Sequence, residues 1–249
     1  MPRSDGRTES QLRPIKFTRK FTMHAPGSVL CEFGNTKVLC SAMVEDFVPP
    51  HIKSANYSKK PEEREGWLSA EYGMLPSSTN TRKQRDKAGK VDGRSVEIQR
   101  LIGRSLRTII DLGQIGERTI WLDVDVLQAD GGTRTAGITG CYVALWDCLL
   151  AMKEKGQLKY WPLIDSVAAV SVGVIGNAPM LDLCYEEDVR AETDMNVVMT
   201  GKGNFIEVQG TAEKVPFERK RLDELLELAT RGCAELCKIQ KKTLSEPGA

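Results

Sequence analysis

The sequence predicts an α+β fold with two subdomains in which mixed sheets pack on helices. The first observation is an alternating strand pattern that runs into a glycine turn and a long apolar helix between residues 120 and 152. The second is the order of the elements, because strands and two helices are followed by further strands and a last helix. The third is the segment Gln157–Asp165, which is expected to be a linker between these two series. We therefore expect subdomains at residues 1–156 and 157–249.

The first half is expected to begin with three strands after a polar arm. Met1–Pro14 is the arm, and its Arg3, Arg7 and Arg13 are candidates for contact with a partner. Val48–Gly66 has paired prolines and many charges, which is typical of a solvated, mobile loop. The strands are predicted at Ile15–Thr22, Gly27–Phe33 and Thr36–Val44, with Gly34-Asn35 as the hairpin turn between the last two.

Three helices and four further strands complete the expected elements. Ser95–Leu112 has helical apolar periodicity, and Asp92 is placed to cap it. A second helix follows the glycine turn and reaches about residue 155, where Gly156 is placed as a C-cap residue. The last helix is expected at Phe217–Lys241. The strands of the second half are predicted at Val167–Ile175, Met180–Tyr185, Met195–Thr200 and Phe205–Gln209.

Composition excludes several classes of site. A net charge of +1 gives no global basic field, so any nucleic-acid site must be local. The 7 cysteines contain no Cys-x-x-Cys pair and mostly follow apolar patterns, which predicts buried thiols rather than disulfides or zinc ligands. His24 and His51 lie far from any Ser, Cys or carboxylate motif, which disfavours a histidine triad. The charge-free run at residues 166–181 is too short to span a bilayer, so we expect no membrane partner. Buried thiols in place of disulfides predict an intracellular, cytoplasmic protein.

The segment Gln128–Gly137 joins the strand to the central helix and is a candidate phosphate site. Two adjacent glycines, Gly131 and Gly132, permit a sharp turn and leave no Cβ to obstruct a ligand. The first amides of a helix lack internal partners and favour an anion. Thr133 adds a hydroxyl and Arg134 a cation. The alternative is an ordinary strand-to-helix connection, because the segment lacks the nucleoside-triphosphate P-loop and dinucleotide-binding motifs.

A basic loop and an acidic loop are the other candidate sites. Thr79–Arg94 is rich in Lys and Arg, including Arg82, Arg85 and Arg94, and suits either a clamp for an anionic polymer or a solvated loop. In the second half, Asp188 is expected to close one strand and Asp194 to open the next. Two carboxylates held together favour a cation between them, and oxygen ligands without histidine favour Mg²⁺ or Mn²⁺. The alternative is a solvated acidic turn.

Several ordered sequence blocks are spread over nearly the whole chain. The blocks are Gly27–Leu30, Glu32–Cys40, Ala70–Pro76, Glu97–Ile102, Asp125–Thr135, Ala191–Val198 and Glu207–Glu213. Together they resemble the ribonuclease PH family, whose members are phosphate-dependent 3′-to-5′ exoribonucleases related to polynucleotide phosphorylase and to the exosome ring proteins.

The resemblance implies a ribonuclease PH-like fold with a ribosomal-protein-like N-terminal half, and it implies a role for each candidate residue. Inorganic phosphate, the co-substrate, would bind at Arg94, Gly132, Thr133 and Arg134. Asp188 and Asp194 would be catalytic and would hold Mg²⁺ or another divalent cation. Arg82 and Arg85 would bind RNA, whereas Ser77 stands where many relatives have another arginine.

The expected reaction transfers the 3′-terminal nucleotide of precursor tRNA, and of rRNA as a further substrate, to phosphate. It releases a nucleoside diphosphate and is reversible. The family also implies a ring-shaped homohexamer built as a trimer of dimers. Three alternatives stay open from the sequence: a non-catalytic RNA-binding ring subunit of an exosome-like assembly, a small-molecule kinase, and an exonuclease that uses water in place of phosphate.

Overall fold

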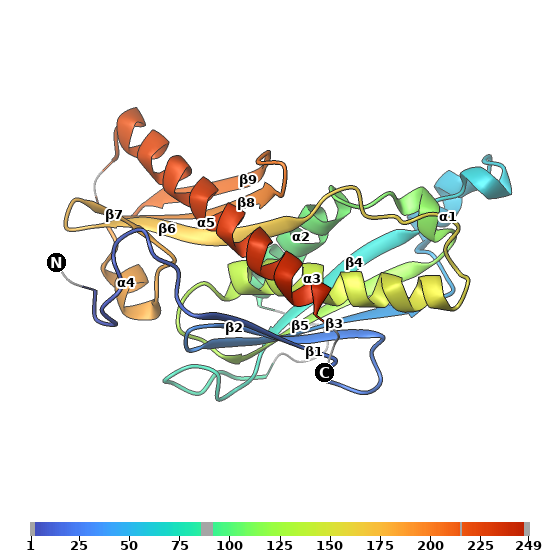
Figure 1. Ribbon diagram of the computed structural model, residues 1–249, viewed down its shortest axis with the longest axis horizontal. Helices are drawn as coiled ribbons and strands as arrows, with labels where there is room; N and C mark the ends of the chain where they lie inside the picture. The colour runs from blue at the N-terminus through green and yellow to red at the C-terminus, as the bar shows by residue number, and fades with distance from the viewer. Residues whose placement is uncertain (1–2, 86–91, 215, 247–249) are drawn as a thin grey trace.

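Two sheets enclose a central helix in the computed structural model, which describes residues 3–85, 92–214 and 216–246 (Figure 1). The first sheet has the order β1-β2-β3-β5-β4 and the second β7-β6-β8-β9. The strands are β1 Ile15–Arg19, β2 Gly27–Phe33, β3 Thr36–Glu45, β4 Trp67–Met74, β5 Thr119–Gln128, β6 Val167–Ile175, β7 Ala178–Leu181, β8 Thr193–Thr200 and β9 Phe205–Ala212. The helices are α1 Pro50–Asn56, α2 Gly93–Arg107, α3 Thr133–Glu154, α4 Tyr185–Arg190 and α5 Arg219–Ser245, with short 3₁₀ turns η1 Pro61–Glu63 and η2 Leu112–Ile115.

The first sheet is antiparallel except at its last pair. β1, β2, β3 and β5 pair antiparallel, whereas β4 pairs parallel to β5. This reversal follows from the connection, because β4 and β5 are joined through α2 rather than by a hairpin. On β5 the alternating residues Ile120, Leu122, Val124 and Val126 are buried under α3, as their period predicts. The mixed sheet of the α+β prediction is confirmed.

Helix α3 is buried on all sides rather than along one stripe. It packs on β2 and β3 of the first sheet and on β6 of the second, with α2 and α5 beside it (Figure 1). A helix that is apolar all round belongs in a protein core or a membrane, and α3 is long and apolar enough for either. In this fold the protein buries 83% of the most apolar stretch of α3. The helix therefore serves as the shared wall between the sheets.

The second sheet lies between α3 and α5. Strand β6 is buried along almost its whole length because α3 packs on one face and α5 on the other. This double burial explains the charge-free run of the sequence. The buried apolar residues of both halves form one continuous cluster that includes Met152, Leu158 and Val167. The subdomain boundary near residue 156 stays a prediction. All 7 cysteines are free and nearly all are buried, as predicted.

Several element predictions were wrong in extent or type. Residues 48–66 are not a structureless loop, since they contain α1 and η1, and the buried Asn56 side chain exchanges hydrogen bonds of 2.8 and 3.1 Å with the Glu65 backbone. Helix α2 ends at Arg107 because Ile110 then forms a bridge with Leu163. Residues 185–190 form helix α4, where a strand end and loop were expected, and β7 stops at Leu181. Helix α5 runs to Ser245, beyond the predicted end.

Close contact between α3 and the first sheet requires glycine at position 140. A Cβ built on Gly140 would lie 2.8 Å from Cys40 Sγ and 2.9 Å from Cys31 Cβ. We expect Gly140→Ala to lower the free energy of unfolding by about 1–3 kcal/mol, as overpacked core sites do. Denaturant unfolding followed by circular dichroism measures the change. Gly93→Ala is the control, because a Cβ there meets nothing within 4 Å; equal stability of the two variants would contradict the packing argument.

Candidate active site

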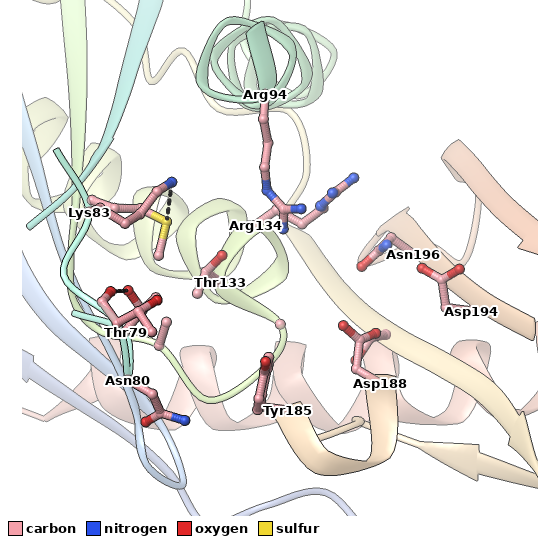
Figure 2. A pocket seen from close by; sticks show the side chains of 16 residues that line it. Thr79, Asn80, Lys83, Arg94, Thr133, Arg134, Tyr185, Asp188, Asp194 and Asn196 are labelled. Carbon is pink, nitrogen blue, oxygen red and sulfur yellow. Dashed lines mark hydrogen bonds between the residues drawn. The ribbon is translucent and has the colours of Figure 1, made fainter. Parts of the chain in front are cut away.

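A cavity of about 500 Å³ opens where the two sheets meet at the start of α3. Its wall includes Arg94, Gly132, Thr133, Arg134, Asp188 and Asp194, so six of the residues selected from the sequence lie together. Figure 2 shows Arg94 reaching the cavity from α2 beside Arg134, while Asp188 and Asp194 face them from the second half of the chain. Cations and acids far apart in the sequence therefore share one site.

The turn before α3 requires glycine at two adjacent positions. Gly131 and Gly132 have φ of 76° and 66°, a region that favours glycine. A Cβ on Gly131 would lie 2.6 Å from Leu183 O, and one on Gly132 would lie 3.0 Å from Arg13 Nη2. No side chain caps the helix start at Gly132, so the first amides of α3 face the cavity without a capping partner. This arrangement suits an oxyanion.

Two side chains at the start of α3 are held by neighbours. Thr133 Oγ1 lies 2.8 Å from the hydroxyl of the buried Tyr72 on β4. Arg134 Nη1 donates to Gln209 Oε1 at 2.6 Å and lies 3.7 Å from Glu97 Oε1. These contacts orient the Arg134 guanidinium while its other nitrogens stay available. Asp92 caps α2 as predicted, by accepting from the amide of Arg94 at 3.4 Å.

The acids come from two elements of the second half. Asp188 lies on α4 and Asp194 near the start of β8. Partial burial raises the pKa of the Asp188 carboxyl and the Asp194 charge raises it further, whereas Arg94 and Arg134 act in the opposite direction. Asp194 Oδ1 is buried and has no hydrogen-bond partner among the residues that the structure describes, and a bound cation would satisfy such an atom.

The donor set fits a hard cation that keeps water ligands. Among the described residues no group of three or more His, Cys, Asp or Glu side chains is arranged to hold a metal. Two carboxylates with Asn196 nearby are sufficient for Mg²⁺, which is bound by one or two carboxylates and retains several waters. Asp188 and Asp194 would be its protein ligands.

The basic loop enters the site only in part. Lys83 lines the cavity, and its Nζ lies 3.6 Å from Met74 Sδ and 3.8 Å from Asp92 Oδ2. Arg82 and Arg85 are exposed and do not line the cavity of this chain. Ser77 is also exposed, on the rim of a neighbouring cavity. Residues 86–91 of the loop lie outside the described part of the chain.

The N-terminal arm differs from its prediction as a partner-binding segment, because its arginines are buried within the chain. The Arg13 guanidinium makes two hydrogen bonds to the Asp182 carboxylate, of 2.6 and 3.0 Å, and its Nη1 donates to Asp130 O at 2.6 Å. Burial lowers the pKa of Arg13, but Asp182 outweighs that effect and the net direction is upward. Arg13 thus ties the glycine turn to the segment that leads into α4.

Arg3 and Arg7 extend the same network. Arg3 makes two hydrogen bonds to the Glu187 carboxylate, of 2.8 and 2.7 Å, and Arg7 Nη1 donates to Asp182 O at 3.1 Å. Glu187 also accepts from the Cys184 amide at 3.0 Å at the start of α4. Since Glu187 immediately precedes Asp188, the arm fixes the short helix that carries this acid.

Sequence reasoning missed the residues that support the site. Tyr72 and Gln209 lie in the blocks Ala70–Pro76 and Glu207–Glu213 but were given no role there, and Asp182 lies in no block. Their partners are 61, 75 and 169 residues away in the chain. The charged arm carried a further signal, since its three arginines stand out in a segment with few apolar residues.

Two family models match consecutive parts of the chain. The model of the 3′ exoribonuclease family, domain 1, matches residues 11–151, and that of domain 2 matches residues 165–232. The chain belongs to the 3′ exoribonuclease family.

A curated relative within this family is similar over nearly the full length. Ribonuclease PH of Corynebacterium efficiens is 56% identical over 243 residues, which cover 97% of this chain and 96% of the relative. This similarity confirms the resemblance drawn from the sequence blocks, and the small-molecule kinase alternative finds no support in it.

Solved structures of 3′ exoribonuclease-like folds resemble the chain as a whole. Rice Rrp46 superposes with a TM-score of 0.75 at 20% identity and covers 98% of this chain and 100% of its own. A subunit of the Archaeoglobus fulgidus exosome with RNA bound to the active site gives a TM-score of 0.77 at 21% identity, over 95% of this chain and 91% of its own. At such identities these likenesses confirm the two-part fold.

Repulsion at the acid pair predicts a stability that depends on pH. The pKa of Asp188 is raised in the folded state, so folding favours its protonated form. At neutral pH the ionised carboxylate therefore lowers the free energy of unfolding. This loss of stability disappears as the pH falls through the raised pKa. With a chelator present, Asp188→Asn should therefore raise Tm at neutral pH. Neighbouring atoms only partly enclose the Asp188 carboxyl and the residue keeps an exposed surface, so solvent screens the repulsion and we expect at most about 2–4 °C.

Thermal unfolding of both proteins across the acidic range measures this difference, which should shrink toward low pH. Glu235→Gln, an exposed carboxylate in the middle of α5, is the control and should show no such trend. A variant less stable than the wild type at neutral pH would refute the repulsion.

Proposed function

We propose that this chain is a phosphate-dependent 3′-to-5′ exoribonuclease that trims the 3′ end of precursor tRNA, with rRNA as a further substrate. The observation that carries the proposal is the single cavity in which an oxyanion seat at the start of α3 faces two carboxylates. The 56% identity to a ribonuclease PH supports the same activity. Each cycle shortens the RNA by one nucleotide and releases a nucleoside diphosphate.

The proposed reaction depends on the positioning of inorganic phosphate rather than on a strong general base. Inorganic phosphate is already a nucleophile, and the obstacle is its approach to an anionic phosphodiester. Arg94, Arg134 and the free amides of α3 neutralise and orient it, with the Thr133 hydroxyl as a further contact. A phosphate oxygen attacks the last phosphorus, the bond to the preceding ribose 3′-oxygen breaks, and that oxygen takes up a proton. Since the bond formed resembles the bond broken, the reaction also runs backwards when diphosphates are abundant.

Asp188 and Asp194 complete the site from the opposite side. We assign them a divalent cation, Mg²⁺ in the first place, because the buried Oδ1 of Asp194 has no hydrogen-bond partner among the described residues and the two charges repel. A bound cation would supply stabilisation of the negative charge on the transferring phosphoryl group and on the departing oxygen. Asp188 and Asp194 would be the residues that hold it.

RNA contacts and assembly extend beyond one cavity. Arg82 and Arg85 are exposed on the basic loop and free to grip an RNA backbone. Because Arg82 and Arg85 do not line this chain's own cavity, they suit a ring in which the basic loops serve neighbouring subunits, so we propose a homohexamer built as a trimer of dimers. The Archaeoglobus structure is that of an exosome, and another structural neighbour is an archaeal exosome core, which supports ring assembly. We place the protein in the cytoplasm.

Arg134→Ala tests the phosphate seat. Wild-type protein with single-stranded RNA should release nucleoside diphosphates only when phosphate is added. The variant should lose at least about 100-fold in kcat/KM for phosphate, as preorganised charge contacts do, while RNA affinity changes little. Mononucleotide products are identified by chromatography and RNA affinity by fluorescence anisotropy, with Arg231→Ala on α5 as the control.

Three outcomes would contradict the proposal. Nucleoside monophosphates formed without phosphate would indicate hydrolysis, and RNA binding without any product would indicate a non-catalytic ring subunit. An equal loss of phosphate use and of RNA binding in Arg134→Ala would remove the role given to Arg134.

Asp194→Asn tests the cation site. The variant should fold and bind RNA but lose turnover, because one ligand and one charge are missing. Added Mg²⁺ or Mn²⁺ should raise the Tm of the wild-type protein, since a ligand of the folded state stabilises it, and should leave the Tm of Asp194→Asn unchanged. Full activity in the variant, or an equal metal-dependent Tm shift in both proteins, would rule out the assignment.

A further inference from the structure

A second cavity, of about 340 Å³, lies between α2 and the edge of the first sheet. β4 is the last strand of that sheet, so its outer edge has no neighbouring strand in the described part of the chain. The wall includes Trp67 and Ser69 of β4 and Gln99, Arg100, Arg104 and Arg107 of α2, and none of the lining residues is acidic. None of them belongs to the active site.

Arg107 is fixed in this wall without a carboxylate partner. Its guanidinium lies 4.6 Å from the centroid of the Trp67 ring, and its Nη1 donates to Leu68 O at 2.9 Å on the edge of β4. The His51 ring meets Trp67 edge-on at 5.1 Å and supports this stack. Burial lowers the pKa of Arg107 and the Arg104 charge lowers it further. An anion in the cavity would relieve both effects.

The charge of the cavity is not balanced by the protein. Arg104 forms an ion pair with Glu207 of β9. Arg100 is exposed and has no ion pair or hydrogen bond with any residue that the structure describes. Three guanidinium groups therefore face one carboxylate, and they are spread over two turns of α2. That spread suits a row of phosphates on a chain better than a single small ion.

Strand β9 links this cavity to the active site. Gln209 contacts Arg134 at 2.6 Å and Glu97 at 2.9 Å, and two residues earlier on the same face of β9 Glu207 contacts Arg104. Arg104 follows Arg94 by ten residues on α2, which is about 15 Å along the helix axis. A single RNA strand covers that distance in a few nucleotides.

We propose that the cavity between α2 and β4 binds backbone phosphates of the substrate RNA upstream of its 3′ end. Arg100, Arg104 and Arg107 supply the cations, and Gln99 and Ser69 supply hydrogen-bond donors. The inference rests on the proposed function, because that function makes RNA the anionic polymer at this surface. A longer RNA then gains affinity over a dinucleotide, which reaches only the active site.

Arg100→Gln tests the inference, with Arg100→Glu as a charge reversal and Arg231→Gln as a matched control on α5. Kd is measured by fluorescence anisotropy without phosphate, over a range of salt, for an oligoadenylate long enough to pass both cavities and for a labelled dinucleotide. We expect Arg100→Gln to raise Kd several-fold for the long RNA only and to reduce the slope of log K against log salt by about one. Arg100→Glu should give a larger loss.

Two results would overturn the inference. The first is a Kd and a salt slope for Arg100→Gln equal to those of Arg231→Gln. The second is a loss of subunit association in sedimentation that accounts for the weaker binding, because the cavity would then be an interface between copies of the chain. These measurements need no turnover, so a wild-type protein that binds long RNA through Arg100 but releases no nucleoside diphosphate would refute the proposed function and leave this inference standing.

Discussion

The buried ion pair between Arg13 and Asp182 joins the two halves of the active site. One side of the Arg13 guanidinium holds the carboxylate of Asp182, and Nη1 holds the carbonyl of Asp130 at the glycine turn. Breaking a buried pair of this kind costs about 3–5 kcal/mol, because it leaves a charge without a partner in the interior. The distance between the phosphate seat and the helix that carries Asp188 is therefore set by a contact that touches neither substrate.

Helix α3 makes this coupling possible. Because it packs on both sheets, its first turn lies where the end of the first sheet meets the acids of the second. The fit against β2 and β3 is close enough to require glycine at position 140. Residues from β4, α2, α3, α4 and β8 thus converge on one cavity, together with the basic loop and the glycine turn.

The arginines and the aspartates of the cavity each form an incomplete set of charges. The acids repel one another and leave a buried oxygen unsatisfied, while Arg94 and Arg134 lower the pKa of Asp188 across the same space. A phosphate on the arginines and a cation on the aspartates would complete both sets. Such preorganised charge is the main source of rate enhancement when the reacting groups are anionic. The Arg134–Gln209–Glu97 contacts show that this positioning continues beyond the cavity wall.

The sequence by itself determined the α+β class, most strands, the strand–glycine–helix unit and six of the residues that line the cavity, because periodicity, glycine turns and charged loops are local properties. It also gave the family, since the ordered blocks depend only on residue order. It could not place the arm: its arginines were candidates for contact with a partner, whereas Arg3 and Arg13 are held by carboxylates of the same chain that lie more than 160 residues away. Nor could it show that residues 185–190 form a helix, because the Arg3–Glu187 pair that holds this turn exists only in the folded chain. Long-range burial decides which charges are solvated and which are structural, and only the tertiary structure decides that burial.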